Sequence, residues 1–500
     1  MKRSFLFVLK CLGALTAVVI ALAVAIGIAL RQPTPLTVPP QGVALAGVTV
    51  VNPGRDRRAD QIVAVEGPTI KTIADVGSPG APTADARYRG AFVLPGLIDM
   101  HVHGLPLVGP PAALGGAYMF LMYLRYGVTT IRDTGNPGWM FDMRRRLLNG
   151  EIAGPRAFTG GPILDGDPPW RAPVSKVVRT PAAAERAVAE LAEQGADFVK
   201  VYERLTPEAL QAIEVAARQR GLPVVGHVPE LVRFEDAHID DVQHLTGAID
   251  QPLRLYTSFP DFLLGTAKGW HDMDDARIAF VVRTSREQHI AHTPTLVVLD
   301  RVWRKDFDAQ RSEPIAQLMP AWFPNVFWQR SADGLTPEQL SELKKYDGPL
   351  TKAKLLVRRL HEGGVTLHLG TDVLNPYVVP GESLHEEMRE FLDCGFTPEE
   401  VWSAATRGNG AALPLADLGM LKPGAPADLL VFRDDPTTGF SKLDSLEAVI
   451  ANGRLYTRED LDGAIARFRE RFESPAYERT MTALMRMMPR PYTIEWPTPK

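Results

Sequence analysis

Two histidines stand one residue apart directly after an apolar, strand-like run, in the stretch LPGLIDMHVHG from Leu94 to Gly104. Side chains at positions i and i+2 of a strand lie on the same face, so His101 and His103 are expected to point toward one place. Two converging imidazoles can form half of a metal site, whereas an exposed His-x-His in a loop would not. The rest of the chain has to distinguish these interpretations.

Four more short apolar runs carry a polar residue of metal-binding or catalytic type at or near their ends. These residues are Lys200 in ADFVKVY, His227 in VVGHV, His244 in VQHL and Asp372 in LGTD. Each alone has an ordinary explanation, such as a lysine that reaches solvent or an aspartate that caps a helix. In a barrel the carboxyl ends of the strands meet at one rim, so these side chains are expected to lie together.

Lys200 has apolar neighbours on both sides, and an ammonium group among them is costly unless it is paired or altered. A neutral lysine amine can add carbon dioxide and become a carbamate. Such an anion would bridge two divalent cations at the separation of about 3.5–4 Å typical of two-metal sites. Histidines together with carboxylates suit zinc best. The ligands would be His101, His103 and Asp372 for one ion, and His227 and His244 for the other.

The elements that must position these residues alternate between strand-like and helix-like segments. The eight strand candidates are LIDMHVH, VTTIRDTG, RAFTGGPIL, ADFVKVYE, PVVGHV, DVQHLTG, HTPTLVVL and VTLHLGTD. Amphipathic stretches lie between them, and two of these begin with Thr-Pro, which suits a helix start. Eight strands alternating with helices predict a (β/α)8 TIM barrel over residues 94–414, in the α/β class.

The chain ends differ from the barrel. Short apolar runs broken by Gly and Pro, typical of a small β unit, occur in residues 42–93 and again in 415–460. Residues 461–500 form a tail with a charged helix and a Pro-rich end. One connection, about residues 300–349, is long and rich in aromatic residues; a lid over the barrel and a packed helical insertion are both open.

The N-terminus predicts a membrane anchor in residues 1–31. Cys11–Leu30 is uncharged and close to the ~20 apolar residues that span a bilayer. Lys2, Arg3 and Lys10 precede the run and one arginine follows it, which places the N-terminus in the cytoplasm and the bulk outside, at the cell surface or in the periplasm. The alternative is a cleaved signal peptide and secretion, although the run is long for one. Residues 32–41 read as a Pro-rich linker.

Composition excludes some classes of function. The hydrophobic fraction of 45% and the charged fraction of 23% are ordinary for a folded protein, and the net charge of −4 gives no basic footprint for nucleic acid. With two cysteines, one inside the apolar N-terminal run, a disulfide framework is excluded. The sequence does not indicate an oligomeric state.

Taken in order, LPGLIDMHVH, FVKVY, VVGHV, VQHLTG, LGTD and LKPGAPADLLVF resemble the amidohydrolase superfamily. The likeness covers roughly residues 42–455 and is nearest to the imidazolonepropionase-related, prolidase-like metal-dependent dipeptidases. The resemblance implies that a β-sandwich built from both chain ends, 42–93 and 415–460, flanks the barrel.

The resemblance also implies a reaction that fits these residues. A hydroxide bridging two metals would attack an amide or peptide carbonyl, and Asp372 would act as general base and then acid. The expected substrate is a small one, a dipeptide such as Xaa-Pro or an N-acyl amino acid. Tyr202 shares a strand face with Lys200 and could contact substrate, as could Arg132 and His292 at other strand ends.

Three alternatives stay open. Glu230 follows His227 by three residues, a spacing that resembles the single-metal deaminases of the superfamily, in which Lys200 would have no role. A cyclic amidase, or ring hydrolase like imidazolonepropionase, is a second alternative. A membrane-tethered binding protein without activity is the third, but a decayed site would be expected to lack a ligand.

Overall fold

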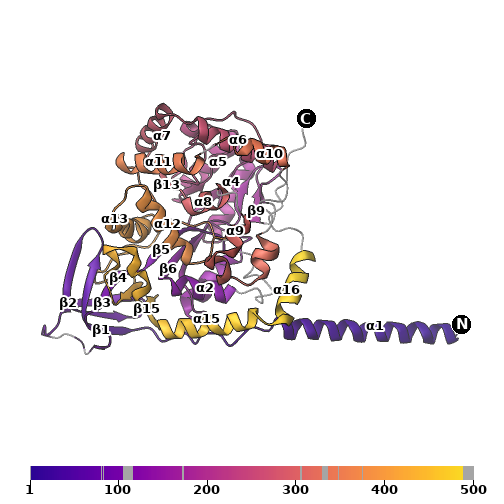
Figure 1. Cartoon of the computed structure of the whole chain (residues 1–500), viewed down its shortest axis with the longest axis horizontal. Coiled ribbons are helices and arrows are strands. Elements are labelled where there is room, and N and C mark those ends of the chain that lie inside the picture. The colour runs from indigo at the N-terminus through magenta and orange to yellow at the C-terminus, as the bar shows by residue number, and fades with distance from the viewer. Residues whose placement is uncertain are drawn as a thin grey trace.

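The structure is a computed structural model that describes residues 2–79, 82, 84–104, 116–171, 174–303, 307–328, 336–346, 348–373 and 375–487. The Pro-rich end of the predicted tail, 488–500, and parts of the 300–349 insertion lie outside the described residues. Three parts are visible in Figure 1: a β sheet at one end, a barrel surrounded by helices, and a long N-terminal helix that leaves the globule at the other end.

Parallel strands form the barrel in the predicted order. β5 (Leu97–Val102), β6 (Val128–Asp133) and β7 (Arg156–Thr159) pair in one sheet; β8 (Ile163–Asp165), β10 (Val199–Val201), β11 (Val224–Gly226), β12 (Asp241–Gln243) and β13 (Ala291–Thr293) pair in another, with β9 (Ser175–Val177) at its edge. Bridges from Leu367 to His292 and from Val373 to Val102 place the eighth segment between β13 and β5. The third predicted strand is divided into β7 and β8, and the eighth is held by isolated bridges.

Helices cover the outside of the barrel. They are α2 (Gly116–Arg125), α3 (Met140–Asn149), α4 (Pro181–Glu193), α5 (Pro207–Arg218), α6 (Phe259–Asp272), α7 (Asp275–Glu287), α11 (Pro349–Glu362), α12 (Glu382–Asp393) and α13 (Pro398–Ser403). Thr180 and Thr206 cap α4 and α5 through their side chains, and a proline follows each. Both predicted Thr-Pro helix starts are confirmed.

The predicted strand HTPTLVVL is wrong in its second half, because residues Leu296–Trp303 form helix α8. Thr295 has a φ of 48°, which ends the strand. The buried Glu387 carboxylate then accepts hydrogen bonds from the amides of Leu296 (3.0 Å) and Val297 (2.8 Å). A carboxylate at these free amides stabilises the start of a helix, and a run of apolar residues does not reveal such a distant partner.

Both chain ends build the flanking β unit. Its seven strands run in the order β16 (Arg454–Thr457), β15 (Leu446–Ala451), β14 (Leu429–Phe432), β4 (Phe92–Pro95), β1 (Val43–Asn52), β2 (Asp56–Glu66) and β3 (Thr69–Asp75). The sheet curls on itself, because Ile70 in β3 exchanges backbone hydrogen bonds with Gly424 and Ala425 ahead of β14. It therefore encloses a core of its own, which includes Leu45, Val63, Val93, Leu429 and Ile450.

The long connection is a packed helical insertion. After α8 it contains α9 (Phe307–Ser312), short helical turns at Pro314–Leu318 (η4) and Phe323–Phe327 (η5), and α10 (Pro337–Leu343). Trp322, Phe323 and Trp328 are buried, and the Trp328 ring lies 5.0 Å from that of Tyr377. Tyr377 follows Asp372 by five residues, so the insertion packs on the segment that leaves the eighth strand.

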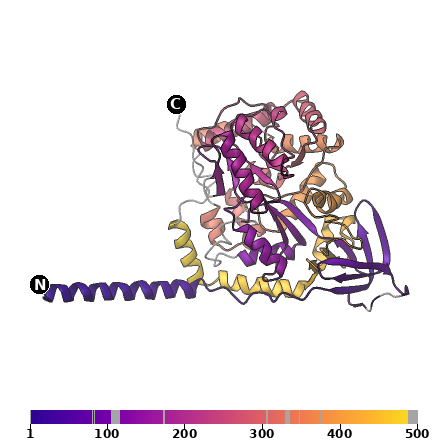
Figure 2. The ribbon, with the colours of Figure 1, turned by 180° about the vertical axis from the view of Figure 1, so that it is seen from behind.

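The predicted charged helix of the tail is α15 (Arg458–Phe472), and a second helix, α16 (Pro475–Met487), follows it. The N-terminal helix α1 (Lys2–Ala29) meets α16 where it joins the globule, as Figures 1 and 2 show from opposite sides. Lys10–Ala29 is long and apolar enough to cross a membrane.

Candidate metal centre

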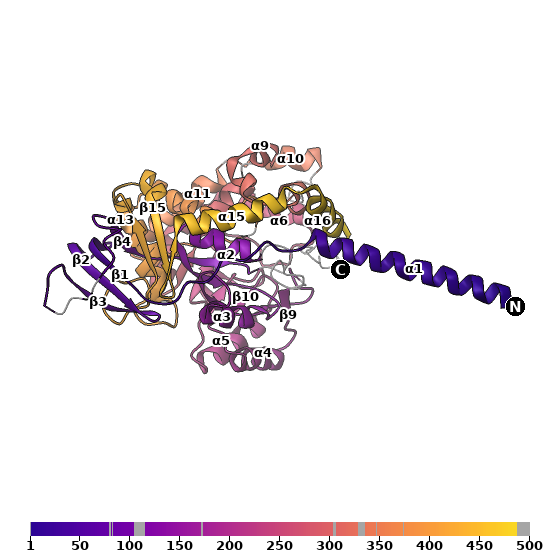
Figure 3. The same ribbon diagram turned by 90° about the horizontal axis from the view of Figure 1, so that it is seen from below.

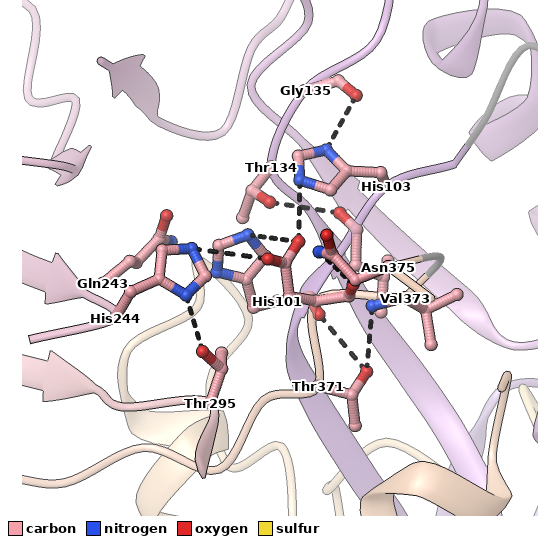
Figure 4. A network of polar contacts seen from close by, with 12 residues as sticks. His101, His103, Thr134, Gly135, Gln243, His244, Thr295, Thr371, Val373 and Asn375 are labelled. Atoms are coloured by element: carbon pink, nitrogen blue, oxygen red, sulfur yellow. Dashed lines mark hydrogen bonds and ion pairs between the residues drawn. The ribbon is translucent and has the colours of Figure 1, made fainter. Parts of the chain in front are cut away.

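Asp372 stands at the middle of a cluster of histidines at the carboxyl rim of the barrel. Its Oδ1 lies 3.3 Å from His101 Nε2 and 3.0 Å from His103 Nε2, and its Oδ2 lies 3.6 Å from His244 Nε2. Figure 4 shows the three rings turned toward one carboxylate. Donor atoms about 2 Å from one cation in a tetrahedral arrangement lie roughly 3.3 Å apart, so these separations suit ligands of a shared ion.

His227 is the fourth histidine of the cluster. Its ring centroid lies 4.8 Å from that of His244, which in turn lies 4.6 Å from that of His101. His227 Nε2 is buried and has no hydrogen-bond partner among the described residues. An unpaired buried nitrogen is costly, and a metal ion is one partner that would satisfy it.

Oxygen atoms hold the opposite nitrogen of three of these rings. His103 Nδ1 lies 3.2 Å from the Gly135 carbonyl oxygen, His244 Nδ1 lies 2.6 Å from Thr295 Oγ1, and His227 Nδ1 lies 2.5 Å from Glu203 Oε1. Such outer contacts fix the tautomer and leave Nε2 free to bind a metal. Neither Thr295 nor Glu203 was predicted, although Glu203 follows Tyr202 directly at the end of its strand.

Lys200 is completely buried beside this cluster. Its Nζ donates a hydrogen bond to Oε1 of Gln243, a neutral acceptor, and Gln243 Nε2 has no partner among the described residues. Burial, partly opposed by Asp372, lowers the pKa of Lys200 to about 7. A neutral amine can be converted to a carbamate. The oxygen atoms of that carbamate could accept a hydrogen bond from the unused amide donor of Gln243.

The electrostatics of the cluster favour metal ligation. Burial holds the pKa of His101 and His227 well below the ordinary value and lowers that of His244 to about 4. Burial would raise the pKa of Asp372, but the neighbouring histidines hold it well below its usual range. Neutral imidazoles around an ionised carboxylate are the protonation states that bind a divalent cation.

The backbone at two of these residues is strained. His244 has a φ of 56° and Asp372 a φ of 59°, both in the left-handed region that non-glycine residues rarely adopt. Each such residue costs about 1–3 kcal/mol and persists where its surroundings impose it. Here the amide of Asp372 bonds to the His101 carbonyl (2.6 Å), and that of His244 to the Thr293 carbonyl (3.0 Å).

Buried carboxylates hold the loops that carry the candidate ligands. Asp99 accepts hydrogen bonds from Thr371 Oγ1 (2.6 Å) and from the His101 amide (3.2 Å). Asp133 accepts hydrogen bonds from the Gly104 amide (2.6 Å), one residue after His103, and from Thr159 Oγ1 (2.8 Å). These contacts tie β5 to its neighbours on both sides.

Two of the predicted substrate contacts point away from the rim. The Arg132 guanidinium donates to the Met100 carbonyl (2.7 Å) and forms an ion pair with Asp241, inside the barrel. His292 faces the helical layer, where its Nε2 lies 2.9 Å from Ser285 Oγ of α7. Side chains alternate along a strand, so a position near its end does not by itself reach the mouth; neither residue is retained as a substrate contact.

Tyr202, predicted as a substrate contact, lies against the histidine cluster. Its ring centroid is 4.1 Å from that of His227, and Lys200 Nζ lies 5.3 Å from the Tyr202 ring. Burial raises the pKa of the Tyr202 hydroxyl, so the group remains a hydrogen-bond donor at all moderate pH values.

Glu230 forms its hydrogen bond to a segment outside the histidine cluster. Its Oε2 accepts a hydrogen bond from the Tyr256 amide (3.0 Å), and burial raises its pKa to about 7. No hydrogen bond or ion pair joins Glu230 to the four histidines among the described residues. This position does not favour the proton shuttle of a single-metal deaminase.

Comparison with known proteins identifies the family to which this chain belongs. The model of the Amidohydrolase family matches residues 92–456, which is most of the chain. This chain belongs to the amidohydrolase family. The superfamily resemblance predicted from its motifs is therefore confirmed, and this amidohydrolase is placed among hydrolases that act on C–N bonds.

The relatives of this amidohydrolase are distant. Imidazolonepropionase from Streptomyces avermitilis is 25% identical over 406 residues, which cover 76% of this chain and 81% of the relative. Among solved structures, a Xaa-Pro dipeptidase with bound methionine is 20% identical with a TM-score of 0.60, covering 83% of this chain and 100% of that one. Bottromycin amidohydrolase is 22% identical with a TM-score of 0.64, covering 88% and 91%. The two structures establish the shared TIM-barrel fold alone.

Proposed function

We propose that this chain is a binuclear metal-dependent hydrolase that cleaves an amide or peptide bond in a small substrate. The observation that carries the proposal is the convergence of three imidazoles on the Asp372 carboxylate, with a fourth, that of His227, next to His244 and the buried Lys200 beside them. A decayed barrel would be expected to lack at least one of these groups, so the complete set argues against a binding protein without activity.

His101, His103, His227, His244 and Asp372 would hold two divalent cations, zinc being the ion that suits these donors best. Lys200 would join them as the carbamate, oriented by the Gln243 side chain. Asp372 lies within 3.6 Å of three histidines, so it can serve more than one ion. When bound, the cations would supply Lewis acidity, which lowers the pKa of a water molecule and polarises the scissile carbonyl.

Side chains of the protein would accept and donate the protons of the reaction. Asp372 is ionised and central, so it can accept a proton from the attacking water and return it to the leaving nitrogen. Tyr202, a permanent donor against the His227 ring, could bond the carbonyl oxygen or a carboxylate of the substrate. His244 and His227, held by Thr295 and Glu203, would keep their rings fixed while this occurs.

The proposed substrate is a dipeptide such as Xaa-Pro or an N-acyl amino acid. The likeness to a Xaa-Pro dipeptidase over nearly the whole barrel supports a short substrate. The packed insertion next to the segment after Asp372 supports a closed pocket rather than an open groove.

A second candidate is the hydrolysis of a cyclic amide. Two relatives that match about three quarters of the chain are imidazolonepropionases. The same ligands could open a ring amide, because attack on a carbonyl and protonation of nitrogen are common to both reactions.

We also propose that α1 anchors the enzyme in a membrane, with the globule on the extracytoplasmic side. Its support is the apolar span Lys10–Ala29 and the positive charges that precede it. Loss of α1 as a cleaved signal would instead give a secreted enzyme.

One experiment tests the reaction. Zinc-loaded protein should be assayed against a panel of dipeptides, N-acyl amino acids, lactams and aminated rings, with metal content measured on the same sample. Hydrolysis of dipeptides or N-acyl amino acids is expected. A metal-replete enzyme that opens only ring amides would favour the second candidate, and release of ammonia from aminated rings would favour deamination.

A further inference from the structure

The globule holds the end of α1 directly. Arg471 of α15 donates hydrogen bonds to the carbonyl oxygens of Ile28 (2.8 Å), Ala29 and Arg31 (3.1 Å). Ala29 and Leu30 are buried, with 7% and 9% of their surface exposed. Because the apolar span also ends at Ala29, the point where the helix would leave the bilayer is the point where it enters the globule.

Residues 32–41, predicted as a Pro-rich linker, lie against the globule. The Arg467 side chain of α15 donates to the Thr34 carbonyl (3.4 Å), and Leu36 and Val38 pack on the main core. Figure 1 shows this segment running back along α15 toward β1. The Pro-rich segment therefore lies along the globule as a strap. It leaves no free length of chain between the globule and α1.

The barrel mouth lies on the side from which α1 emerges. β5 begins two residues after β4 of the flanking sheet and ends at the metal cluster, so the strands run away from that sheet. Figures 1 and 3, seen at right angles, both place the flanking sheet at one end of the globule and α1 beyond the other. A helix that crosses a bilayer thus sets the mouth toward the bilayer.

Exposed apolar side chains are found on this side. Leu253 follows β12 in the loop that leads to α6 and is 43% exposed; Met487, at the end of α16 that leads away from α1, is 81% exposed. Arg479 and Arg486 on α16 are also exposed. Apolar tips together with arginines suit the interface of a membrane.

We propose that the catalytic mouth faces the bilayer and takes amphiphilic amides from it, namely amino acids carrying a long N-acyl chain. This inference rests on the proposed amide hydrolysis and on the attached anchor. In the reaction, water supplies oxygen to the acyl carbon, the C–N bond breaks, and the protons leave with the amine, giving a fatty acid and a free amino acid. No further reactant is needed.

The orientation can be tested without any substrate. Cys394 is buried, so a Cys11→Ala background offers no accessible thiol among the described residues. Leu253→Cys and Met487→Cys would carry a fluorescent label on the full chain in phosphatidylcholine vesicles with brominated acyl chains. Val76→Cys, directly after β3 of the flanking sheet and 37% exposed, is the matched control. Quenching at 253 and 487 but not at 76 is expected.

Absence of quenching at 253 and 487 in membrane-bound protein, or quenching at 76, would overturn the orientation. A mature N-terminus near Arg31 in the native host would overturn it as well, because no anchor would then remain.

The substrate class needs a second measurement on the full chain in vesicles. A hexadecanoyl amino acid is placed either in the same vesicles as the enzyme or in separate ones, and the acetyl analogue is the control. Because a long acyl chain leaves a bilayer slowly, cleavage should be at least roughly tenfold faster in the shared vesicles. Equal rates would overturn the inference while leaving the proposed function intact; failure to cleave either compound would instead contradict the proposed function.

Discussion

At the scale of single residues, Lys200 separates two-metal from one-metal chemistry. Lys200→Ala should reduce the metal content from about two ions per chain and remove most of the activity, because the bridging anion is lost. Metal analysis together with the dipeptide assay measures both effects. Partial recovery with bicarbonate and a short-chain acid would support the carbamate. A variant that stayed active, from a parent with one metal, would point to deamination through Glu230.

Asp372 should matter more for turnover than for metal binding. Asp372→Asn keeps the size and the oxygen donor but cannot take a proton, so kcat should fall by several orders of magnitude while much of the metal remains. Asp167→Asn, at an exposed ion pair with Arg179, is the control and should behave like the parent. Loss of all metal with Asp372→Asn would contradict this expectation, because the carboxylate would then be essential for holding the ions.

Replacement of Glu230 should have the opposite outcome from replacement of Lys200 or Asp372. Glu230→Gln preserves an oxygen that can accept the hydrogen bond from the Tyr256 amide, so the fold and the metal content should be unchanged. The activity should change by less than about tenfold. Inactivation with full metal content would contradict the position that the structure gives this side chain and would favour the deaminase.

The clustering of the candidate ligands could be predicted from sequence, because residue type and strand ends suffice to propose them. Gln243, Thr295 and Glu203 could not, since their roles depend on which strand lies next to which. Arg132 and His292 failed for a related reason: being near a strand end does not decide between barrel interior, rim and helical layer. Their partners, Asp241 and Ser285, lie 109 and 7 residues away in the chain.

At the scale of elements, the insertion is expected to support the pocket. Trp328 is buried against Tyr377, so Trp328→Ala should cost about 3–5 kcal/mol of the free energy of unfolding. Since Tyr377 follows Asp372 closely, KM should also rise. Trp402→Ala, an equally buried tryptophan that packs on Phe432 of the flanking sheet, should lower the melting temperature without changing KM. Equal KM values in the two variants would contradict a role for the insertion in the pocket.

Element boundaries were predicted less well where a distant residue decides them. The eight barrel segments follow from alternating runs and Thr-Pro starts. The helix α8 depends on the Glu387 carboxylate, 91 residues from Leu296, and the strap of residues 32–40 depends on α15 near the other chain end. No local pattern in either segment reveals these partners.

At the scale of the whole molecule, the full chain should fractionate with membranes and its globule should be accessible to protease from the outer side. Deletion of residues 1–31 should release an active enzyme, because every proposed ligand lies at or beyond His101. Fractionation, protease protection and the amide assay check the three points. A full-length protein that stays in the soluble fraction would contradict the anchor.

Chelation should also lower stability. Among the described residues, the buried Nε2 of His227 has no hydrogen-bond partner, and ions that bind only the folded state stabilise it by mass action. Calorimetry should show a lower melting temperature after dialysis against a chelator and recovery with zinc. An unchanged melting temperature would mean that the cluster holds no ion tightly.

The flanking sheet imposes a delay on biosynthesis. β4 lies between β1, on its N-terminal side in the chain, and β14, which begins 334 residues after Pro95. At about 5–20 residues per second, a ribosome needs about 20–70 seconds to make that interval. Through this time β4 presents an unpaired apolar edge, the kind of surface on which chains aggregate. An emerging chain of this protein is therefore expected to need a chaperone that shields β4 until β14 arrives.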